Sequence, residues 1–426
     1  MTNIIFLGPY KPIMCGIADY TSFITENSRN GNWGIISFNI HKYGAPLTSN
    51  LQISPERLWY GISDRDSYSN RDIRAGLEKL GFDKQNSVLW FQHEFGIWHD
   101  NSRFIDMLKN LDFPRIVTMH SLHFQSSETP SGLRRSQYDF LSQLLPNVEA
   151  ITVFSHGVHQ AVSQAFPAYR HKVHILKHGI HSYPDVCYMS RTEAKASLND
   201  YLLYESDIDQ KTKERLYRKR ILLDPDFTVI GQSGFLTPAK GSELLFTMRN
   251  NLKKLMPYKN IAAVRIGASR DETQRAYANQ LRQRLDGNSS FLLETWLPES
   301  MLPVAQRAFD INFYWPVDCT QSGILAHALG AGAIVAGREL EGVGETLKQA
   351  YQPVSAEQEI LQIKMIKLIL NPVFCEMAEE RALEYASEYC WENQARRHFE
   401  LASDVLPGER LLPVLPDSPA ASIKIS

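Results

Sequence analysis

The sequence predicts an α/β protein of two domains, each built on a mostly parallel, doubly wound sheet. The chain has 426 residues, which is more than one ordinary hydrophobic core supports, so two domains are expected. Short apolar runs alternate with helical patterns in both halves, as they do in βαβ units. Runs such as Ile4 to Leu7 are continuously apolar, which suits strands that are buried on both faces.

The strand candidates are the short apolar runs of each half. In the first half they are Asn3–Leu7, Gly34–Phe38, Ser87–Gln92, Arg115–Met119, Ala150–Phe154 and Lys172–Leu176, and in the second half they are Phe227–Gln232, Ile261–Ile266, Ser290–Leu293, Asp310–Phe313 and Ala333–Ala336. Both halves therefore follow one plan. We predict a first Rossmann-like domain over residues 1–185 and a second one over residues 225–395.

The segment between the two domains, residues 186–224, differs from both in composition. From Thr192 to Arg220 it is dense in charged residues and helix formers. This composition favours a solvated linker helix or an insertion. An alternative is that its basic end, Arg215 to Arg220, contacts an anionic membrane surface or acceptor.

Composition excludes several classes of protein. The 45 basic and 47 acidic residues give a formal net charge of −2, so no general basic field recruits nucleic acid. The five cysteines are odd in number and form no C-x-x-C pair, which argues for a reducing compartment. No apolar run approaches the ~18–20 residues of a membrane span, and the N-terminus lacks a secretory pattern. We therefore expect a cytoplasmic protein.

Loops after strands are where ligands collect in open α/β sheets, because helix N-termini point their free N–H groups there. The loop after the first strand contains Lys11, and its Gly16 precedes a helical pattern. A glycine at that place lets the backbone approach a ligand closely. Ordinary turn chemistry at a helix start is the alternative.

The second domain has two such loops. In the first, Lys240 stands before a helix that begins near Gly241, where a lysine and the helix dipole act together on an anion. In the other, Gln321, Ser322 and Gly323 open a small apolar helix. Their backbone N–H groups can bind a phosphate or a sugar hydroxyl.

Histidines are concentrated in the first domain, where ten of the thirteen lie between His93 and His181. Several form H-x-x-H pairs, but the pairs fall in different predicted loops and strands and no H-E-x-x-H completes a ligand set, so we expect no metal site. His120 ends a strand candidate, where a histidine can donate to a hydroxyl or act on developing charge; the alternative is a hydrogen-bonded histidine that only closes the strand. His93, Glu94 and Gly96 end the preceding strand, and Glu94 there suits a polyhydroxylated ligand or a structural pair with His93.

A set of short segments shares its order along the chain with one enzyme family. The segments are Gly16–Tyr20, Gln92–Gly96, Val117–His120, His178–Ile180, Gly234–Gly241, Ser322–Gly332 and Trp391–Asn393. With them the sequence resembles the family 4 glycosyltransferases, in particular their mannosyltransferase-like members. That family consists of retaining enzymes of the GT-B fold, in which two Rossmann-like domains face each other across a cleft. The resemblance also implies that residues 396–426 contain a helix that crosses back to the first domain, followed by a tail.

The resemblance implies a function and a set of site residues. A UDP or GDP sugar would bind mainly to the second domain and transfer its sugar, without a metal or other cofactor, to a hydroxyl of a glycan, lipid-linked sugar or small molecule. The implied catalytic residues are His120, Lys240 and Glu94, the donor-binding residues are Gly16, Phe235, Lys240, Arg265, Gln321, Ser322, Gly323 and His327, and the acceptor-side residues are His93, Gly96 and Lys11.

The sequence departs from the family pattern at charged positions. Phe235 stands near the place of the family's arginine, and Cys319 and His327 occupy the places of its E-x7-E acids. Lys177 likewise replaces the proline of the P-H-G segment. Arg265 or Arg270 is a candidate for the missing positive charge. The alternative function is a non-catalytic GT-B protein that binds a ligand or supports a partner.

Overall fold

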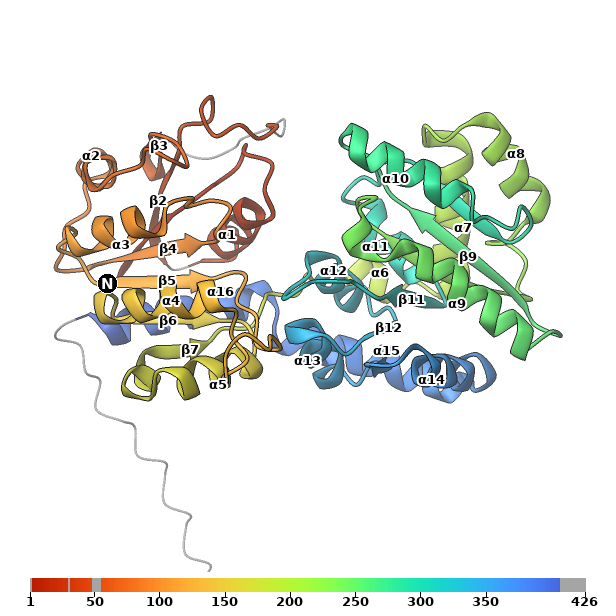
Figure 1. Cartoon of the computed structure of the whole chain (residues 1–426). Helices are drawn as coiled ribbons and strands as arrows, with labels where there is room; N and C mark the ends of the chain where they lie inside the picture. The colour runs from red at the N-terminus through yellow and green to blue at the C-terminus, as the bar shows by residue number, and fades with distance from the viewer. Residues whose placement is uncertain (1, 30, 48–54, 407–426) are drawn as a thin grey trace, which may run out of the picture.

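The computed structural model describes residues 2–29, 31–47 and 55–406, which form two α/β domains (Figure 1). The first contains a parallel sheet in the order β3-β2-β1-β4-β5-β6-β7. Its strands are β1 (Asn3–Leu7), β2 (Asn32–Phe38), β3 (Leu58–Ile62), β4 (Ser87–His93), β5 (Arg115–Met119), β6 (Ala150–Val153) and β7 (Val173–Ile175). Its helices are α1 (Gly16–Glu26), α2 (Asn70–Leu80), α3 (Asn101–Lys109), α4 (Arg135–Leu144) and α5 (His156–Ala165).

The second domain repeats the plan with a parallel sheet in the order β10-β9-β8-β11-β12-β13. Its strands are β8 (Phe227–Ser233), β9 (Asn260–Ile266), β10 (Ser290–Leu293), β11 (Ile311–Tyr314), β12 (Val335–Arg338) and β13 (Val354–Ser355). Its later helices are α9 (Ser242–Leu255), α10 (Glu272–Arg282), α11 (Met301–Ala308), α12 (Gly323–Gly330), α13 (Glu341–Gln349), α14 (Gln358–Leu370) and α15 (Pro372–Glu388).

The fold class predicted from the sequence is confirmed, and the strand candidates differ from the observed strands mainly at their ends. Two strands were not predicted, and both have a physical reason. β3 lies at the edge of its sheet and is largely half-buried, and its short run of Leu58 to Ile62 contains a glycine, which is depleted in strands. β13 has only two residues, too few for any periodicity.

The charged segment over residues 186–224, expected to be a linker helix or an insertion, packs against the second domain. It forms α6 (Pro184–Cys187), α7 (Arg191–Asp200) and α8 (Gln210–Lys219), and its apolar residues are buried in one core with β8, β9 and β10. The Arg215 guanidinium lies 4.0 Å from the centroid of the Phe291 ring and donates to the Ser290 carbonyl. Long charged side chains cover apolar surface with their stems, so composition alone misrepresents this segment. Its basic end packs in part against the second domain.

The chain returns to the first domain at its last described helix, α16 (Trp391–Val405). Trp391, Ala395 and Leu401 are buried in one core with residues of β1 and β4. The Ile180 amide donates to the Tyr389 carbonyl at 2.9 Å, so the two connections between the domains lie side by side. The tail predicted within residues 396–426 falls largely at 407–426, outside the described residues.

Strand order decides where a ligand site can form. In the first sheet the order reverses between β1 and β4, and in the second it reverses between β8 and β11. Ligands of open α/β sheets bind beyond the carboxyl ends of strands at such reversals. The arrowheads of β4 and β5 point toward the second domain (Figure 1). In the described part of the chain, no helix is both long and apolar enough to span a membrane.

Candidate functional site

The loops after β8 and β11 are joined by a chain of polar contacts that begins at Lys240. The Lys240 ammonium lies 3.5 Å from the Tyr314 hydroxyl and 5.6 Å from the centroid of its ring. That hydroxyl donates to the Ser322 hydroxyl at 2.8 Å, and the Ser322 hydroxyl accepts from the Leu325 amide and caps α12. Lys240 is therefore directed toward the N-terminus of α12.

The N-terminus of α12 leaves two backbone donors available. Among the described residues, the amides of Gly323 and Ile324 make no hydrogen bond, and a Cβ at Gly323 would meet no atom within 4 Å. Two free amides, a helix dipole and a lysine are groups that can bind an anion. Gln321 lies just before it, and its side-chain amide packs against Gly342 at the start of α13.

The N-terminus of α9, the helix that we expected to act with Lys240, is closed by a tyrosine. The Ser242 amide donates to the Tyr277 hydroxyl at 3.1 Å, and the Tyr277 hydroxyl in turn donates to Glu243. Tyr277 lies on α10, outside every segment that the sequence patterns singled out. The Ser242 amide of α9 is thus occupied by a side chain, whereas the Gly323 and Ile324 amides of α12 are not.

Arg265 is a brace for the loop after β8 and does not face a ligand. It is fully buried and donates to the Gly234 carbonyl at 2.9 Å, the Phe235 carbonyl at 2.8 Å and the Ser242 hydroxyl at 2.8 Å. Burial lowers the pKa of its guanidinium to about 9. A buried guanidinium that binds carbonyls of the loop with both terminal nitrogens holds the loop in place.

Phe235, which stands near the family's arginine position, carries an arginine on its ring. The Arg270 guanidinium lies 3.8 Å from the centroid of the Phe235 ring, and the Trp296 ring packs on the same phenyl group at 5.3 Å. Arg270 is exposed and the Trp296 side chain is 57% exposed. A cation and an open aromatic face therefore stand together beside the loop after β8.

His327 stacks on His181, which lies in the chain between β7 and α6. Its ring is parallel to that of His181 with centroids 4.0 Å apart, and its Nδ1 hydrogen-bonds the Tyr183 hydroxyl. Burial lowers the pKa of His327 to about 4. A neutral ring with Nδ1 occupied has one nitrogen left, Nε2, to contact a ligand.

His120 lies where the first domain meets the loop before α12. Its Nε2 is 2.7 Å from the Gln92 side-chain oxygen, its ring packs edge-on against Tyr20 at 5.0 Å, and its carbonyl accepts from the Thr320 hydroxyl at 3.3 Å. Burial lowers its pKa to about 3. Near neutral pH His120 is an uncharged hydrogen-bonding group, oriented by Gln92.

Glu94 and Gly96 form one loop after β4. The Glu94 carboxylate accepts from the Gly96 amide and from the Ser121 hydroxyl, at 3.1 Å for the latter. It therefore connects the loop after β4 to the loop after β5. Gly96 is exposed, and Glu94 is half-buried.

Gly16 and Lys11 lie in the loop after β1, as the sequence indicates. Gly16 begins α1, and a Cβ there would meet no atom within 4 Å. Lys11 pairs with Glu26 at 3.2 Å and lies 5.4 Å from the centroid of the Phe23 ring. Asp19 of α1 has its pKa raised by burial, against the lowering effect of Lys11 and with Glu299 of the second domain adding to the rise.

His93 lies in the hydrophobic core and not in an acceptor site. Its side chain is fully buried, stacks on Phe140 at 4.6 Å between ring centroids and packs against Phe104. Neither ring nitrogen has a hydrogen-bond partner among the described residues. Both faces of β4 are buried, so sequence alternation cannot tell which histidine of this region is internal.

This burial makes His93 a determinant of acid stability. Burial lowers its pKa from 6.5 to about 3, so between these values the unfolded chain binds a proton that the folded chain excludes, and stability falls as the pH falls. We expect His93→Phe to remove about 2 kcal/mol of the stability lost between about pH 8 and pH 5. Urea denaturation at both pH values measures this. The exposed His171→Phe is the control, and an unchanged pH dependence in His93→Phe would contradict the assignment.

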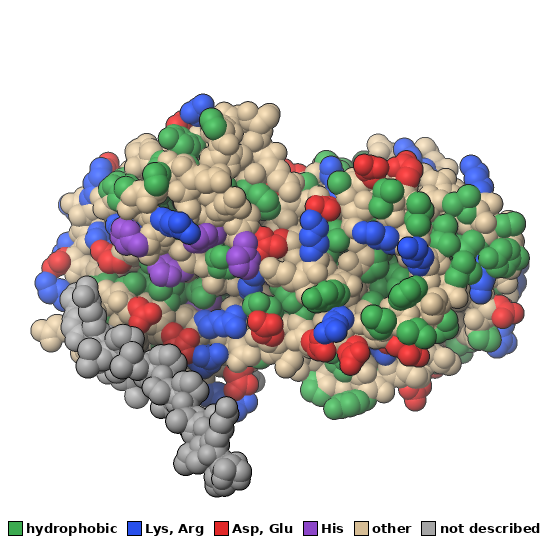
Figure 2. All heavy atoms as spheres, turned by 90° about the horizontal axis from the view of Figure 1, so that it is seen from below, with side chains coloured by type: hydrophobic (Ala, Val, Ile, Leu, Met, Phe, Trp, Pro, Cys, Tyr) green, Lys and Arg blue, Asp and Glu red, His purple; other side chains and the backbone are tan. Residues whose placement is uncertain are grey.

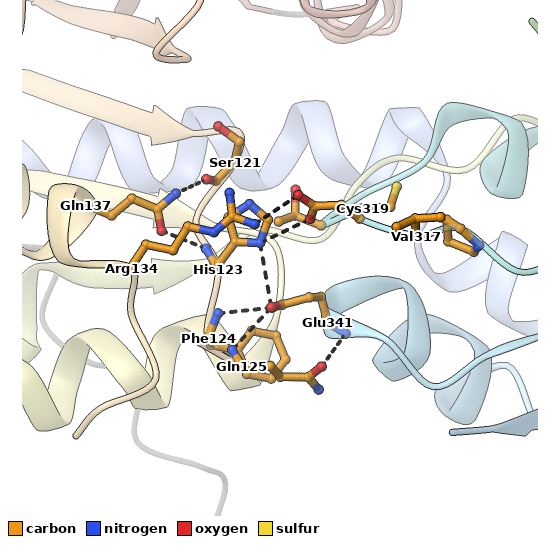
Figure 3. Close-up of polar contacts among 12 residues, drawn as sticks. Ser121, His123, Phe124, Gln125, Arg134, Gln137, Val317, Cys319 and Glu341 are labelled. Carbon is orange, nitrogen blue, oxygen red and sulfur yellow. Dashed lines mark hydrogen bonds and ion pairs between the residues drawn. The ribbon is translucent and has the colours of Figure 1, made fainter. Parts of the chain in front are cut away.

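Two carboxylates of α13 join the domains. Figure 3 shows Glu341 reaching the first-domain loop after β5, where it accepts from the Phe124 amide at 3.0 Å and the Gln125 amide at 3.2 Å and lies 3.6 Å from His123. Arg134 pairs with Asp318 at 2.9 Å in the same region. Glu341 is buried. Its contacts and the Arg134–Asp318 ion pair together hold the loop from Asp318 to Ser322 against the first domain.

Glu345, one turn further along α13, caps a helix of the other domain. It accepts from the His156 amide at 2.8 Å and the Gly157 amide at 3.0 Å, at the N-terminus of α5. It also pairs with the buried Lys177. Burial is the largest single influence on Glu345 and acts to raise its pKa. The two amide hydrogen bonds and Lys177 together outweigh burial, so the pKa of Glu345 falls to about 2. Lys177 of the first domain therefore has a partner in the second domain.

Two facing Rossmann-like domains and a last helix that returns to the first define the GT-B class of fold. Solved structures of this class resemble the chain. A sucrose-phosphate synthase from Thermosynechococcus elongatus has a TM-score of 0.67 at 12% identity, over 95% of this chain and 99% of that one. A UDP-forming α,α-trehalose-phosphate synthase from Burkholderia xenovorans, in complex with glucose-6-phosphate, has a TM-score of 0.62 at 10% identity, over 94% and 100%.

A third solved structure, trehalose-6-phosphate from E. coli bound with UDP-2-fluoro glucose, has a TM-score of 0.62 at 10% identity, over 94% of this chain and 99% of that one. The sequence matches no protein-family model and no curated protein. At these identities the likeness establishes the fold. The family 4 assignment stays a prediction.

Proposed function

We propose that this protein is a glycosyltransferase that binds a nucleotide diphosphate sugar between its domains and transfers the sugar to a hydroxyl group. The observation that carries the proposal is the anion site formed by Lys240 and the N-terminus of α12. It stands at the reversal of the second sheet, and the loop leading to it contacts His120 through Thr320. Structures with the same fold, bound with UDP-2-fluoro glucose or glucose-6-phosphate, support this class of ligand.

The donor would lie along the second domain. Its diphosphate would bind the Lys240 ammonium and the free amides of Gly323 and Ile324, and its base would stack on the exposed Trp296 ring. Arg270, held over Phe235, would supply the guanidinium that the family places in the loop after β8. His327 would offer its free ring nitrogen to a donor hydroxyl.

Transfer would depend on charge stabilisation. When the bond between the sugar and the diphosphate breaks, negative charge grows on the leaving phosphate, where Lys240 and the α12 amides stabilise it. The neutral His120 hydrogen-bonds a sugar hydroxyl, and the loop of Glu94 and Gly96 holds the acceptor. Contacts of α13 with the first domain keep the cleft closed, which limits hydrolysis. Retention of configuration and independence from metal are parts of this proposal.

Calorimetric titration with UDP, GDP and their sugars tests donor binding, and release of UDP or GDP tests turnover. We expect one nucleotide to bind and its sugar to be transferred to an added acceptor. The anomeric configuration of the product tests retention, and the effect of a chelator on turnover tests metal use. Binding without turnover would support the non-catalytic alternative. Failure to bind any nucleotide would overturn the proposal.

The stacking of the base gives a separate prediction. Trp296→Ala is expected to weaken nucleotide binding by about 1–2 kcal/mol, or about 5- to 30-fold, because an exposed aromatic face is lost. Calorimetry with the preferred nucleoside diphosphate measures the change. Tyr258→Ala, at another exposed aromatic residue of the second domain, is the control. Equal affinities in wild type and Trp296→Ala would show that the base does not stack on Trp296.

A further inference from the structure

A cavity of about 490 Å³ lies on the second domain between the end of α13 and helices α14 and α15. This volume is typical of small-molecule sites. We call it the α14 cavity, and its buried floor includes Leu368 and Ala378. None of the residues that line it belongs to the loops of the proposed donor site. It is therefore a separate place on the molecule.

The charge of the α14 cavity is of one sign. Lys364, Lys367 and Arg381 line it, and none of its lining residues is acidic. Lys364 donates to the Val354 carbonyl at 2.6 Å and keeps two further N–H groups. The Lys367 ammonium makes no ion pair or hydrogen bond with any described residue, and Arg381 has an exposed partner at 2.6 Å. These cations fit an anion.

The apolar side of the α14 cavity is open to solvent. Phe374 is 45% exposed and Met377 is 51% exposed, and both line the cavity. Large apolar side chains gathered around a hollow indicate a site for an apolar or aromatic group. The ligand that fits both features is an anion with an apolar substituent.

Tyr351 adds a second, independent observation at the rim. Tyr351 follows α13 and has a φ of 51°. The Gln352 amide donates to the Leu347 carbonyl and so closes the helix. In helix ends of this kind the position of Tyr351 is usually occupied by glycine. A tyrosine there is strained. Its ring is nevertheless 72% exposed, with the Arg381 guanidinium 5.2 Å from the ring centroid. A strained, exposed aromatic residue at a cavity rim is a feature of ligand clamps.

We propose that the α14 cavity binds a phosphate ester with an aromatic or aliphatic substituent. The phosphate contacts Lys364 and Lys367, and the substituent packs against Tyr351, Phe374 and Met377. The site does not depend on the proposed transferase activity. The phosphate ester belongs either to a soluble metabolite or to the headgroup of a lipid, since both present the same chemical group.

The outer face of α14 is relevant to a lipid as the source of the phosphate ester. Ile360, Ile363 and Leu370 share one helical face with Lys367 and are 43–51% exposed. Figure 2, which views the molecule from below, shows hydrophobic side chains interspersed with basic and acidic ones over the second domain, on the side where α14 and α15 lie in Figure 1. An apolar face with lysines beside the cavity is suited to contact with a bilayer that carries the ester.

Fluorescence titration of the whole chain with 1-naphthyl phosphate tests the proposal, with 1-naphthol as the uncharged comparison. We expect saturable binding of the phosphate and at least about tenfold weaker binding in the double variant Lys364→Glu, Lys367→Glu. Tyr351→Gly, which suits the positive φ and deletes the ring, should also weaken binding. Absence of saturable binding, or equal affinity in these variants, would overturn the proposal.

Two controls separate this site from the donor site. Lys254→Glu, an exposed lysine on α9, should bind 1-naphthyl phosphate as wild type does. Lys240→Met should also bind it as wild type does, because Lys240 does not line the α14 cavity. If only Lys240→Met loses 1-naphthyl phosphate, the ester has bound the donor site and the α14 proposal fails while the proposed function stands.

Vesicles decide the source of the ester. We expect sedimentation with vesicles of equal parts phosphatidylcholine and phosphatidic acid, and its loss in the double variant, if the natural ligand is a lipid. Binding of 1-naphthyl phosphate without sedimentation assigns the site to a soluble ester. Absence of both contradicts the proposal.

Discussion

Glu345→Gln is expected to lower the free energy of unfolding by about 3–5 kcal/mol, because it leaves the buried Lys177 ammonium without a counter-charge. Lys177 is only 4% exposed, and its pKa is lowered by burial even with Glu345 present. The two amides of His156 and Gly157 donate to different oxygens of Glu345, and glutamine has only one acceptor oxygen. The loss therefore combines the charge pair with part of the cap of α5. Urea denaturation near pH 7 measures it.

Two further variants identify the cause of that loss. Glu339→Gln removes a carboxylate that pairs with Lys348 at the surface, and it should change stability by less than about 1 kcal/mol. The double variant Lys177→Met, Glu345→Gln removes both buried charges and keeps the same partial cap of α5, so it should recover the part of the stability that was lost with the charge pair. If Glu345→Gln alone leaves the denaturation midpoint unchanged, the two domains are held by other contacts.

The fold could be predicted from the sequence because buried parallel strands are continuous apolar runs. β1 and β5 match their candidates residue for residue. Loops at the carboxyl ends of such strands can then be located without a structure, and Lys240 and Ser322 were found in this way. Their connection through Tyr314 could not be found, because Tyr314 reads only as one more apolar residue of a buried strand.

Side-chain direction limits what the sequence reveals about the site. Arg265 follows an apolar run at the correct edge of the sheet, but only the structure shows that its donors point inward to carbonyls. Glu341 and Glu345 read as ordinary acids of an amphipathic helix. Their partners, including Lys177, lie in the other domain, and no local pattern relates residues so far apart in the chain.

Lys240→Met is expected to weaken binding of the preferred nucleoside diphosphate by about 1.5–3 kcal/mol, or about 10- to 150-fold, because a charge-assisted contact is lost. Methionine keeps the packing of the side-chain stem. The folded protein should not lose stability, since burial lowers the pKa of Lys240, which shows that its charge is held at a cost when no anion is bound. Calorimetry measures the affinity, and urea denaturation measures the stability.

The nucleoside without phosphates sharpens this experiment. Lys240 is joined through Tyr314 to the N-terminus of α12, so it should contact the diphosphate and not the base. Lys240→Met and wild type should then bind the nucleoside equally, and Lys254→Met should match wild type for both ligands. A loss of affinity for the nucleoside as large as that for the diphosphate would mean that the variant disturbs the cleft as a whole. Unchanged affinity for the diphosphate would remove Lys240 from the donor site and with it the observation on which the proposed transferase rests.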